Sequence, residues 1–479
     1  MILFKRLILA LQLLTAAWFL LFGARQTQTI PSNVIVVEYW EKWVGAEADQ
    51  MRLIVDDFNR TVGTDKHIRV RYLSMSKLDQ KLLIASAASV PPDIAGLWDP
   101  QTAEFASLGA VEPLDELAAR HGIDARTYKT VYWDACHYQG KLWALPNTPA
   151  CVALLYNKAI FRSSAEKLRA AGLDPQRPPR TLDELDRYAK ALDVIDSAGR
   201  IRRAGYLPME PGWYVDFTPV WFGGSLFDAK TDRFTLDSPQ NVAAFEWIAS
   251  YSKRLGSTAM VEFHDAAGGF DSPQNSFLTG EVAMEQQGPW MANYFYRLTH
   301  QTPWVSTIAE TKVPHERENE LADRRDNCDW AAAPFPSALP HAENVTICSV
   351  DTLVIPRGAR HPDAAFEFMA YLARQDVMEK LCTLHCKSSP LREVSPEFLT
   401  HHPNPYISVF EAISASPNAR FAPQTPMWEQ LKKELDDATQ SVSRLDADPR
   451  AALASAQERL QGKWDRQRRI DTLRGSAQP

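Results

Sequence analysis

Tryptophans that neighbour polar residues are the side chains in this sequence with the clearest chemical use. An aromatic ring stacks on the C–H face of a sugar, while carboxylates, amides and guanidinium groups hydrogen-bond its hydroxyls. Core packing explains any one of these tryptophans equally well, but their number at expected loops and strand ends favours carbohydrate binding. The set comprises Trp40 with Glu41, Trp43, Trp98 with Asp99, Trp143, Trp213, Trp221 and Trp290.

Two of these tryptophans lie in segments that glycine and proline mark as loops. Trp213 stands in MEPGWYVDF and Trp290 in QQGPWMANY, and such flanks disfavour a regular helix or strand. For both residues we therefore expect ligand contact more than core packing. Trp247 lies within a helical pattern and is expected to belong to the core.

Signatures of catalysis are absent from the sequence. It contains no G-x-x-x-x-G-K-[ST], H-E-x-x-H, G-x-S-x-G or G-x-G-x-x-G, which removes the enzyme classes that leave such motifs. A glycosidase needs only two carboxylates, but nothing singles out a pair among the 59 acidic residues. We therefore expect a protein that is not an enzyme, with no catalytic residue and no cofactor.

Cysteine spacing gives no firm pairing and no metal site. The six cysteines leave fifteen possible disulfide pairings open. Cys382 and Cys386 stand four apart with His385 between them, which resembles a metal cluster. Core thiols at a helix end are the favoured interpretation, and no metal ligand is predicted.

An alternation of strands and helices would position the first tryptophans. Residues 34–40 read as a buried strand, HIRVRYL and PPDIAGLW as two more, and apolar residues at helical spacing lie between them. This order implies right-handed crossovers and a mainly parallel sheet. Ligands of such sheets bind at the carboxyl ends of strands, where Trp40 and the Trp98–Asp99 pair fall.

The rest of the chain is more helical. Thr181 and Glu184 form a capping box before one helix, and Asp237 or Ser238 precedes Pro239 at the start of another. A third helix begins near residue 362. Two polar helices are expected around 427–445 and 449–463, followed by a flexible basic tail over 464–479.

The amino-terminal 29 residues have the pattern of a secretory or anchoring segment. Lys5 and Arg6 precede an apolar run from residue 7 to 24, which is the order of an export signal. Bulky Phe22 would stand three positions before a cut at Arg25, and this favours an uncleaved anchor, with a cleaved signal as the alternative. We therefore expect an extracytoplasmic protein, in the periplasm or at the outer face of the cytoplasmic membrane.

Length and charge limit the architecture and the partners. A chain of 479 residues exceeds one ordinary core, so two domains are expected. The formal net charge of -7 gives no attraction for nucleic acid, which is excluded as a partner.

The motifs together resemble the maltose-binding-protein-like extracellular solute-binding proteins of family 1, which serve ABC importers. The most specific segment is FLTGEVAMEQQGPWMANYF, in which Phe277, Gly280, Ala283, Met284, Gly288 and Trp290 match the family signature. PPDIAGLW, GKLWALP, LLYNKAIF, DWAAAPFP and LVIPRGARHPDAAFEFMAYL follow in the family's order. The resemblance spans roughly residues 33 to 440.

The resemblance implies an α/β, two-lobed, periplasmic-binding-protein-like fold of type II, with three interlobe crossings near 145–150, 288–292 and 350. The ligand would lie in the cleft between the lobes. The implied division is 30–148 plus 291–350 for lobe 1 and 149–290 plus 351–463 for lobe 2.

Site residues follow from the same resemblance. It places Trp40, Glu41, Trp98 and Asp99 on the first lobe, Trp143 beside the first crossing, and Trp213, Trp221 and Trp290 on the second lobe and hinge. Arg392 corresponds to a segment that often approaches the ligand. Two departures from the family pattern are the missing lipid-anchored cysteine and CSVDTL without glycines, and the second weakens any role for Asp351.

The implied function is the capture of a sugar or oligosaccharide by hinge closure of a monomer, and its delivery to ABC permease subunits. A membrane-anchored sensor of the same fold is one alternative, and a gene neighbourhood without permeases would favour it. A carbohydrate-active enzyme is the other, and glycan products would reveal it.

Overall fold

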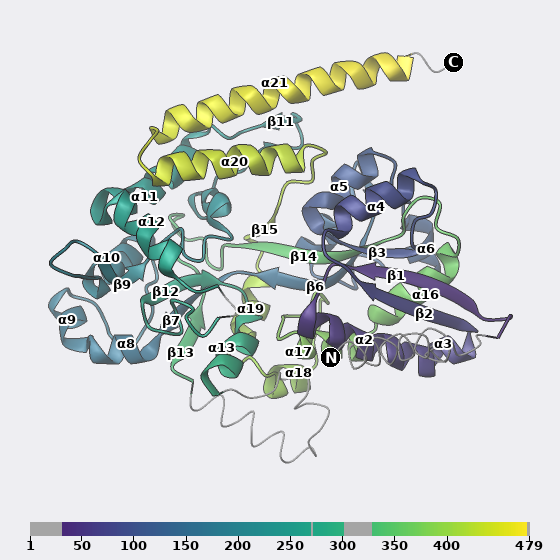
Figure 1. Cartoon of the computed structure of the whole chain (residues 1–479), viewed down its shortest axis with the longest axis horizontal. Helices are drawn as coiled ribbons and strands as arrows, with labels where there is room; N and C mark the ends of the chain where they lie inside the picture. Colours follow the sequence, from purple (N-terminus) through teal and green to yellow (C-terminus); the bar gives the residue numbers. More distant parts are fainter. Residues whose placement is uncertain (1–30, 270–271, 301–327, 477–479) are drawn as a thin grey trace, which may run out of the picture.

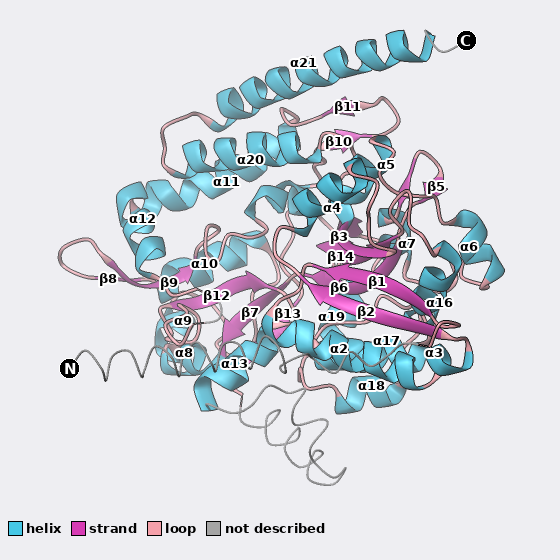
Figure 2. Cartoon of the chain, turned by 45° about the vertical axis from the view of Figure 1, so that its right-hand side comes forward, coloured by secondary structure: helices cyan, strands magenta, loops and turns pink. Residues whose placement is uncertain are grey.

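The computed structural model describes residues 31–269, 272–300 and 328–476. These residues form two lobes, each built on its own β-sheet with helices on its faces, and the two sheets meet at strands β6 and β14 (Figure 1; Figure 2). The amino-terminal segment for which an anchor was expected lies outside the described residues.

The first lobe contains a mixed sheet in the order β15-β14-β3-β1-β2, with β6 pairing β14. Neighbours β1, β2 and β3 are parallel, as the strand and helix alternation predicted. Strand β14 runs antiparallel to β3 and β6, so the sheet is less parallel than expected because this strand enters from the second lobe. The strands are β1 (Ile35–Glu41), β2 (Ile68–Ser74), β3 (Ile94–Trp98), β6 (Leu145–Cys151), β14 (Thr346–Val354) and β15 (Ala419–Phe421).

Helices of the first lobe bury apolar stripes against this sheet. On α2 the predicted stripe of Met51, Ile54, Val55 and Phe58 is buried, and each such side chain contributes roughly 1.5–3 kcal/mol. The helices are α2 (Gly45–Arg60), α3 (Val62–Asp65), α4 (Leu78–Ala87), α5 (Asp99–Ser107), α6 (Asp115–Arg120), α7 (Thr130–Ala135), α16 (Pro362–Leu372), α17 (Gln375–Leu384), α18 (Pro396–His401) and α19 (Ile407–Ser414), with the hairpin β4 (His137–Tyr138) and β5 (Lys141–Leu142).

The second lobe has a five-stranded sheet in the order β13-β7-β12-β9-β8. The predicted caps are present, since Thr181 and Ser238 side chains accept hydrogen bonds from the third residues of α10 and α11. The elements are β7 (Ala153–Asn157), β8 (Val194–Ile195), β9 (Ile201–Tyr206), β12 (Val282–Gln287), β13 (Trp330–Ala333), α8 (Lys158–Ser163), α9 (Ala165–Ala170), α10 (Leu182–Leu192), the 3-10 helix η1 (Val215–Phe222), α11 (Pro239–Leu255) and α12 (Ser257–Ala266). Helix α13 (Met291–His300) follows β12 and packs toward the first lobe.

Two carboxyl-terminal helices pack on the second lobe. Helix α20 (Trp428–Ser443) and helix α21 (Pro449–Ser476) share a core with α11 and with the hairpin β10 (Phe227–Asp228) and β11 (Arg233–Phe234). Helix α21 continues well past residue 463, so the prediction of a flexible tail from 464 is wrong as far as Ser476. The segment contains no proline and several arginines, which favour a helix, and Trp464 anchors it in the core.

The chain passes between the lobes where the resemblance predicted. Strand β6 leads through Val152 directly into β7, and β14 pairs with β6 along this passage. Near residue 290 the chain leaves β12 for α13, whose Met291 and Phe295 pack in the core of the first lobe.

The division of the chain between lobes differs from the expected one in two places. Strand β13, expected in lobe 1, pairs with β7 in the second sheet. Helices α16 to α19 and strand β15, all expected in lobe 2, belong to the first lobe: the helices bury Phe366, Leu381 and Phe410 in its core, and β15 pairs with β14. The reason is that the chain returns through β14 before these helices, so their apolar faces meet the first sheet.

Candidate functional site

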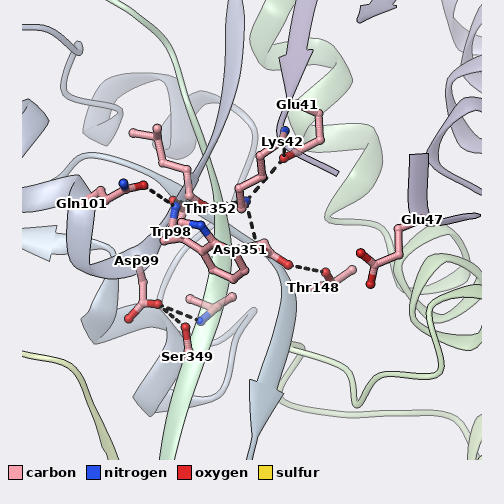
Figure 3. Close-up of polar contacts among 12 residues, drawn as sticks. Glu41, Lys42, Glu47, Trp98, Asp99, Gln101, Thr148, Ser349, Asp351 and Thr352 are labelled. Atoms are coloured by element: carbon pink, nitrogen blue, oxygen red, sulfur yellow. Dashed lines mark hydrogen bonds and ion pairs between the residues drawn. The ribbon is translucent and has the colours of Figure 1, made fainter. Parts of the chain in front are cut away.

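Glu41 and Lys42 stand at the carboxyl end of β1. Gly96 on β3 leaves room for Glu41, because a Cβ at Gly96 would lie 2.1 Å from Glu41 Oε2. The buried Glu41 carboxylate accepts hydrogen bonds from the Tyr39 hydroxyl at 2.6 Å and from the Lys42 backbone N–H at 2.8 Å. Burial raises the pKa of Glu41 despite the opposing charge of Lys42. Glu41 therefore makes its hydrogen bonds within the first lobe, and Lys42 is the group that extends toward β14 (Figure 3).

Asp351 on β14 lies between two lysines from other segments. Its Oδ1 is 2.9 Å from Nζ of Lys42 and its Oδ2 is 3.1 Å from Nζ of Lys387. The Thr148 hydroxyl on β6 donates to Asp351 Oδ2 at 2.9 Å (Figure 3), and Glu47 lies 3.6 Å from Nζ of Lys387. Ion pairs therefore connect β14 to the end of β1 and to the loop after α17, and a hydrogen bond connects β14 to β6.

Lys42, Asp351 and Lys387 form a charged cluster that is buried, so each group stays ionised only because an opposite charge lies beside it. The Asp351 side chain is 3% exposed and the Lys387 side chain 8%. Burial alone would raise the pKa of Asp351, but Lys387 and Lys42 outweigh it and hold that pKa well below its usual range. The pKa values of Lys42 and Lys387 are raised, against burial, chiefly by Asp351. All three groups are therefore charged at neutral pH, and Glu47, 3.6 Å from Nζ of Lys387, offsets the second positive charge.

Two indoles flank the lysines. Nζ of Lys42 lies 4.6 Å from the ring centroid of Trp98, and Trp98 is 49% exposed. Nζ of Lys387 lies 5.5 Å from the ring of Trp43, which is buried. A cation over an indole face favours one orientation of the ring. Trp98 therefore offers an open aromatic surface, whereas Trp43 supports Lys387 from inside the lobe.

Asp99 connects α5 to β14. Its Oδ1 accepts hydrogen bonds from the Ser349 hydroxyl at 2.6 Å and from the Val350 N–H at 3.1 Å (Figure 3). Its Oδ2 is buried without a hydrogen-bond partner among the described residues. Burial raises the pKa of Asp99 to about 7. Asp99 therefore has a firm structural contact through one oxygen and changes protonation near neutral pH.

Trp213 of the second lobe stacks on Trp290, which lies at the crossing near residue 290 and packs against the core of the first lobe. The rings of Trp213 and Trp290 are 6.0 Å apart with an interplanar angle of 17°, and Trp213 is 44% exposed. Gly288 is required beside them, because a Cβ at that position would lie 1.8 Å from the Trp290 ring. The two predicted loop tryptophans thus form one aromatic surface.

The residue after Trp213 lies near the charged side of the first lobe. Tyr214 follows Trp213 directly, and its pKa is raised by burial and then by the nearby Cys151, Asp99 and Asp351. The Tyr214 side chain is therefore within electrostatic range of Asp99 and Asp351.

Glu210 fixes the start of the same loop. Its carboxylate accepts a hydrogen bond from Ser276 Oγ at 3.0 Å and pairs with His264 Nδ1 at 2.9 Å. The hydrogen bond to Glu210 raises the pKa of His264. Glu210 thus holds the segment before Trp213 against α12 and the loop before β12.

A cavity of about 1280 Å³ lies between the lobes. Helix α5 and the β4–β5 hairpin of the first lobe form one wall, and the β10–β11 hairpin with α20 and α21 forms the other. Helix α5 connects this cavity to the charged cluster, because it begins at Asp99 and lines the cavity from Glu104 onward. Burial, followed by Glu429 and Asp79, raises the pKa of Glu104 to about 7. The aromatic lining residues include Tyr138, Trp143, Phe227 and Trp464.

Several predicted site residues lie elsewhere. Trp221 is 1% exposed and donates its indole N–H to the Val345 carbonyl at 2.9 Å, so it is a core residue of the second lobe and the prediction of ligand contact is wrong. Arg392 is exposed and donates to the Ala125 carbonyl at 2.8 Å, on a loop of the first lobe. Trp40 is partly buried within β1.

Trp143 follows the β4–β5 hairpin and lines the cavity rather than the charged cluster. Its indole N–H donates to the Tyr138 carbonyl at 2.9 Å. Trp247, expected in the core, is partly buried against the core of the second lobe.

Sequence reasoning missed Lys42, Lys387, Thr148 and Glu210 as parts of this region. Lys42 directly follows Glu41 at a predicted strand end, and this position was an available signal. Lys387 stands in the loop after α17, in HCKSS, where no local pattern separates it from a surface lysine. Glu210 precedes Pro211 in the same loop as Trp213 and shares its loop signal.

The cysteines near Lys387 serve the core. Cys382, His385 and Cys386 are all buried, and His385 packs edge-on against Trp43 at 4.7 Å. Within the described ranges there is no group of three residues suited to hold a metal ion. Over the same ranges no helix is long and apolar enough to cross a membrane.

The comparisons with known proteins agree with this architecture. The sequence is 24% identical over 214 residues to the maltotriose-binding protein of Pyrococcus abyssi, covering 44% of this chain and 41% of that protein. It is 25% identical over 280 residues to the sn-glycerol-3-phosphate-binding periplasmic protein UgpB of Pectobacterium atrosepticum, covering 55% and 56% of the two chains. The chain thus spans about half the length of these curated relatives.

Solved structures share the fold over most of the chain. The sugar-binding protein MalE of Xanthomonas citri superimposes with a TM-score of 0.70 at 20% identity, covering 91% of this chain and 99% of that one. CpMnBP1 with mannobiose bound gives a TM-score of 0.70 at 21% identity, covering 89% and 99%. The model of the bacterial extracellular solute-binding proteins matches residues 43–379, and the chain belongs to that family.

Proposed function

We propose that this protein is the extracytoplasmic solute-binding subunit of an ABC importer, and that it captures a carbohydrate between its lobes and delivers it to the permease. Its family supports the binding role and the extracytoplasmic location. Relatives described as binding maltotriose or mannobiose support the ligand class. We further propose that residues 1–29 anchor the protein at the membrane.

The observation that carries the proposal is the presence of exposed aromatic surfaces on both lobes. Trp98 is exposed beside Lys42 on the first lobe, and Trp213 is exposed on the second lobe, where it stacks on Trp290 at the crossing near residue 290. A pyranose ring held between such surfaces buries its C–H faces, and polar groups at the strand ends take its hydroxyls.

The compensated charge of the cluster favours a neutral ligand. A phosphate, as in sn-glycerol 3-phosphate, needs cations that are not already neutralised. Lys42 and Lys387 both pair with Asp351, and each has a further glutamate nearby, Glu41 and Glu47 respectively. We therefore propose an uncharged sugar over a phosphodiester or sugar phosphate.

The interlobe cavity favours an oligosaccharide over a single sugar. Its volume of about 1280 Å³ exceeds the usual pocket for a small ligand of ~300–1,000 Å³. Trp143 and Trp464 line it on opposite walls, so an extended ligand would meet aromatic side chains beyond Trp98.

Hinge closure would complete the site. Contacts from both lobes to one ligand stabilise the closed form over the open form. The closed form would then be the one that a permease recognises.

The test is a titration of the exported protein with maltotriose, mannobiose, mannotriose and sn-glycerol 3-phosphate. Calorimetry measures the binding, and small-angle scattering measures the radius of gyration with and without ligand. The proposal expects saturable binding of a neutral saccharide, a smaller radius of gyration in the complex and an unchanged ligand. Preferential binding of glycerol phosphate would contradict the neutral ligand, and conversion of the saccharide would indicate an enzyme.

A further inference from the structure

Two cysteines face each other where the chain crosses between the lobes. Cys151 ends β6 and Cys348 lies near the start of β14, and the antiparallel register pairs them directly. Among the described strands no other register pairs two cysteines. Both side chains are fully buried, so their neighbourhood is fixed by the strands that carry them.

The hydrogen bonds around this pair bring the two side chains together. The Val152 N–H donates to the Ile347 carbonyl at 3.4 Å, which makes Val152 and Ile347 a hydrogen-bonded pair. The adjacent pair, Cys151 and Cys348, is then a non-hydrogen-bonded pair, in which the Cα atoms of an antiparallel ladder approach to about 4.5 Å. Disulfides span Cα separations of roughly 4.4–6.8 Å, so the backbone already has a suitable spacing.

The sulfur atoms also influence one another. Burial raises the pKa of Cys348, and the neighbouring Cys151 thiol adds the next largest effect. The Cys151 thiol also donates a weak hydrogen bond to the Phe410 carbonyl at 3.4 Å. The pair therefore has close thiols with no strong competing partner for Cys151.

The pair marks the boundary between the two lobes. Cys151 is the last residue of β6, and only Val152 separates it from β7 of the second sheet. Its side chain and that of Cys348 face the same core, whereas Val152 and Ile347 on the opposite face pack with residues of the second lobe. A covalent bond here would join two crossing strands at the point where they leave the first lobe.

We propose that Cys151 and Cys348 form a disulfide bond in the exported protein. Proteins of this extracellular family work where disulfides form and persist. The S–S bond forms as both S–H bonds break, and two protons and two electrons leave. A disulfide of the compartment, such as that of a thiol–disulfide oxidoreductase, accepts the electrons and is reduced to two thiols.

The burial of both cysteines determines the stage of folding at which this disulfide forms. The attacking species is a thiolate, and both the inaccessibility of the pair and the raised pKa of Cys348 make thiolates scarce in the folded protein. Oxidation therefore takes place while the exported chain folds, and the finished bond is shielded from reductants. The bond keeps β6 and β14 in register, so that they bend as one unit when the lobes move.

Peptide mapping tests the bond directly. The full chain is exported from a bacterium, denatured in guanidinium chloride at about pH 8 with iodoacetamide present and without reductant, and digested for mass spectrometry. The expected result is a linked peptide pair that contains Cys151 and Cys348, with four alkylated cysteines elsewhere. Alkylation of both residues, or a link from either one to another cysteine, overturns the proposal.

Thermal unfolding provides the second test. Wild type, Cys136→Ser and the double variant Cys151→Ser/Cys348→Ser are each measured as exported and after refolding in dithiothreitol. Cys136 is the matched control, because it is buried in the same core and no strand register pairs it with a cysteine. Reduction should lower the Tm of wild type and Cys136→Ser by several degrees and leave that of the double variant unchanged. An equal decrease in the double variant, or none in wild type, contradicts the bond.

Discussion

The two faces that meet between the lobes are held in place by different forces. On the first lobe, Lys42, Asp351 and Lys387 are buried and paired, with Trp98 exposed above Lys42. On the second lobe, Trp213 stacks on Trp290 at the crossing near residue 290. Buried charges are costly to unpair, whereas an exposed ring contributes little to folding. The first face should therefore matter mainly for stability and the second mainly for affinity.

Substitution of Asp351 should cause the largest loss of stability. Asp351→Ala leaves Lys42 and Lys387 buried without their shared partner, and the expected loss is about 3–5 kcal/mol in the free energy of unfolding. Denaturant titration measures it. The control is Asp363→Ala, which removes an exposed ion pair with Arg120 and should cost about 1 kcal/mol or less. Equal losses would show that the cluster is not a buried network.

Asp99 predicts a pH dependence of stability for the first lobe. Its pKa is raised to about 7 from an unfolded value of about 3.9, so the folded state binds more protons between these values. This contribution is complete below pH ~4 and is lost as the pH rises through ~7.

Asp99→Asn retains an acceptor oxygen for Ser349 and Val350 but does not ionise. The decrease in stability between pH 5 and pH 8 should therefore be smaller in the variant by ~1 kcal/mol or more, because one pKa unit corresponds to about 1.4 kcal/mol. Denaturant titrations at the two pH values measure this difference. Parallel pH profiles for variant and wild type would contradict the assignment.

Trp213 should affect ligand affinity strongly and stability little, the reverse of Asp351. Trp213→Ala removes an exposed ring, and we expect roughly tenfold weaker saccharide binding, about 1.4 kcal/mol, with little change in Tm. Calorimetry and thermal unfolding measure the two effects, and Trp213→Phe should retain most of the affinity. A large loss of stability with normal affinity would place Trp213 in a structural role.

Trp143 gives the finest distinction, because it lines the cavity beyond both faces. Trp143→Ala should weaken binding of a longer oligosaccharide about threefold, ~0.6 kcal/mol, and leave the affinity for a disaccharide unchanged. Comparing two ligands in one variant removes any general effect on folding. Equal losses for both ligands would place the whole ligand near Trp143.

The local pattern of the sequence predicted the strands and helices well. Strands β1 and β3 end at Glu41 and Trp98, where Trp40–Glu41 and Trp98–Asp99 were expected, because apolar runs and caps are short-range signals. Glycine and proline likewise indicated that Trp213 and Trp290 lie in loops.

Pairing over long distances could not be predicted in this way. Lys42 and Lys387 are 345 positions apart by their numbers and meet only because β14 brings Asp351 between them. Trp221 was assigned to the site wrongly because its burial depends on how η1 is oriented against the second lobe. The hydrogen bond from its indole N–H to the Val345 carbonyl, which fixes this orientation, joins segments far apart in the sequence.

Helix α21 would make the motion of the lobes visible at a distance. Its 28 residues extend about 42 Å at 1.5 Å per residue, from the second lobe toward the side of α5 (Figure 1). Because its base is fixed to α20, a lobe rotation of about 10° would move its far end by ~7 Å. The end of α21 therefore moves further than the lobe surfaces do. The distance between one spin label on α21 and another on α6 would report the angle between the lobes in solution.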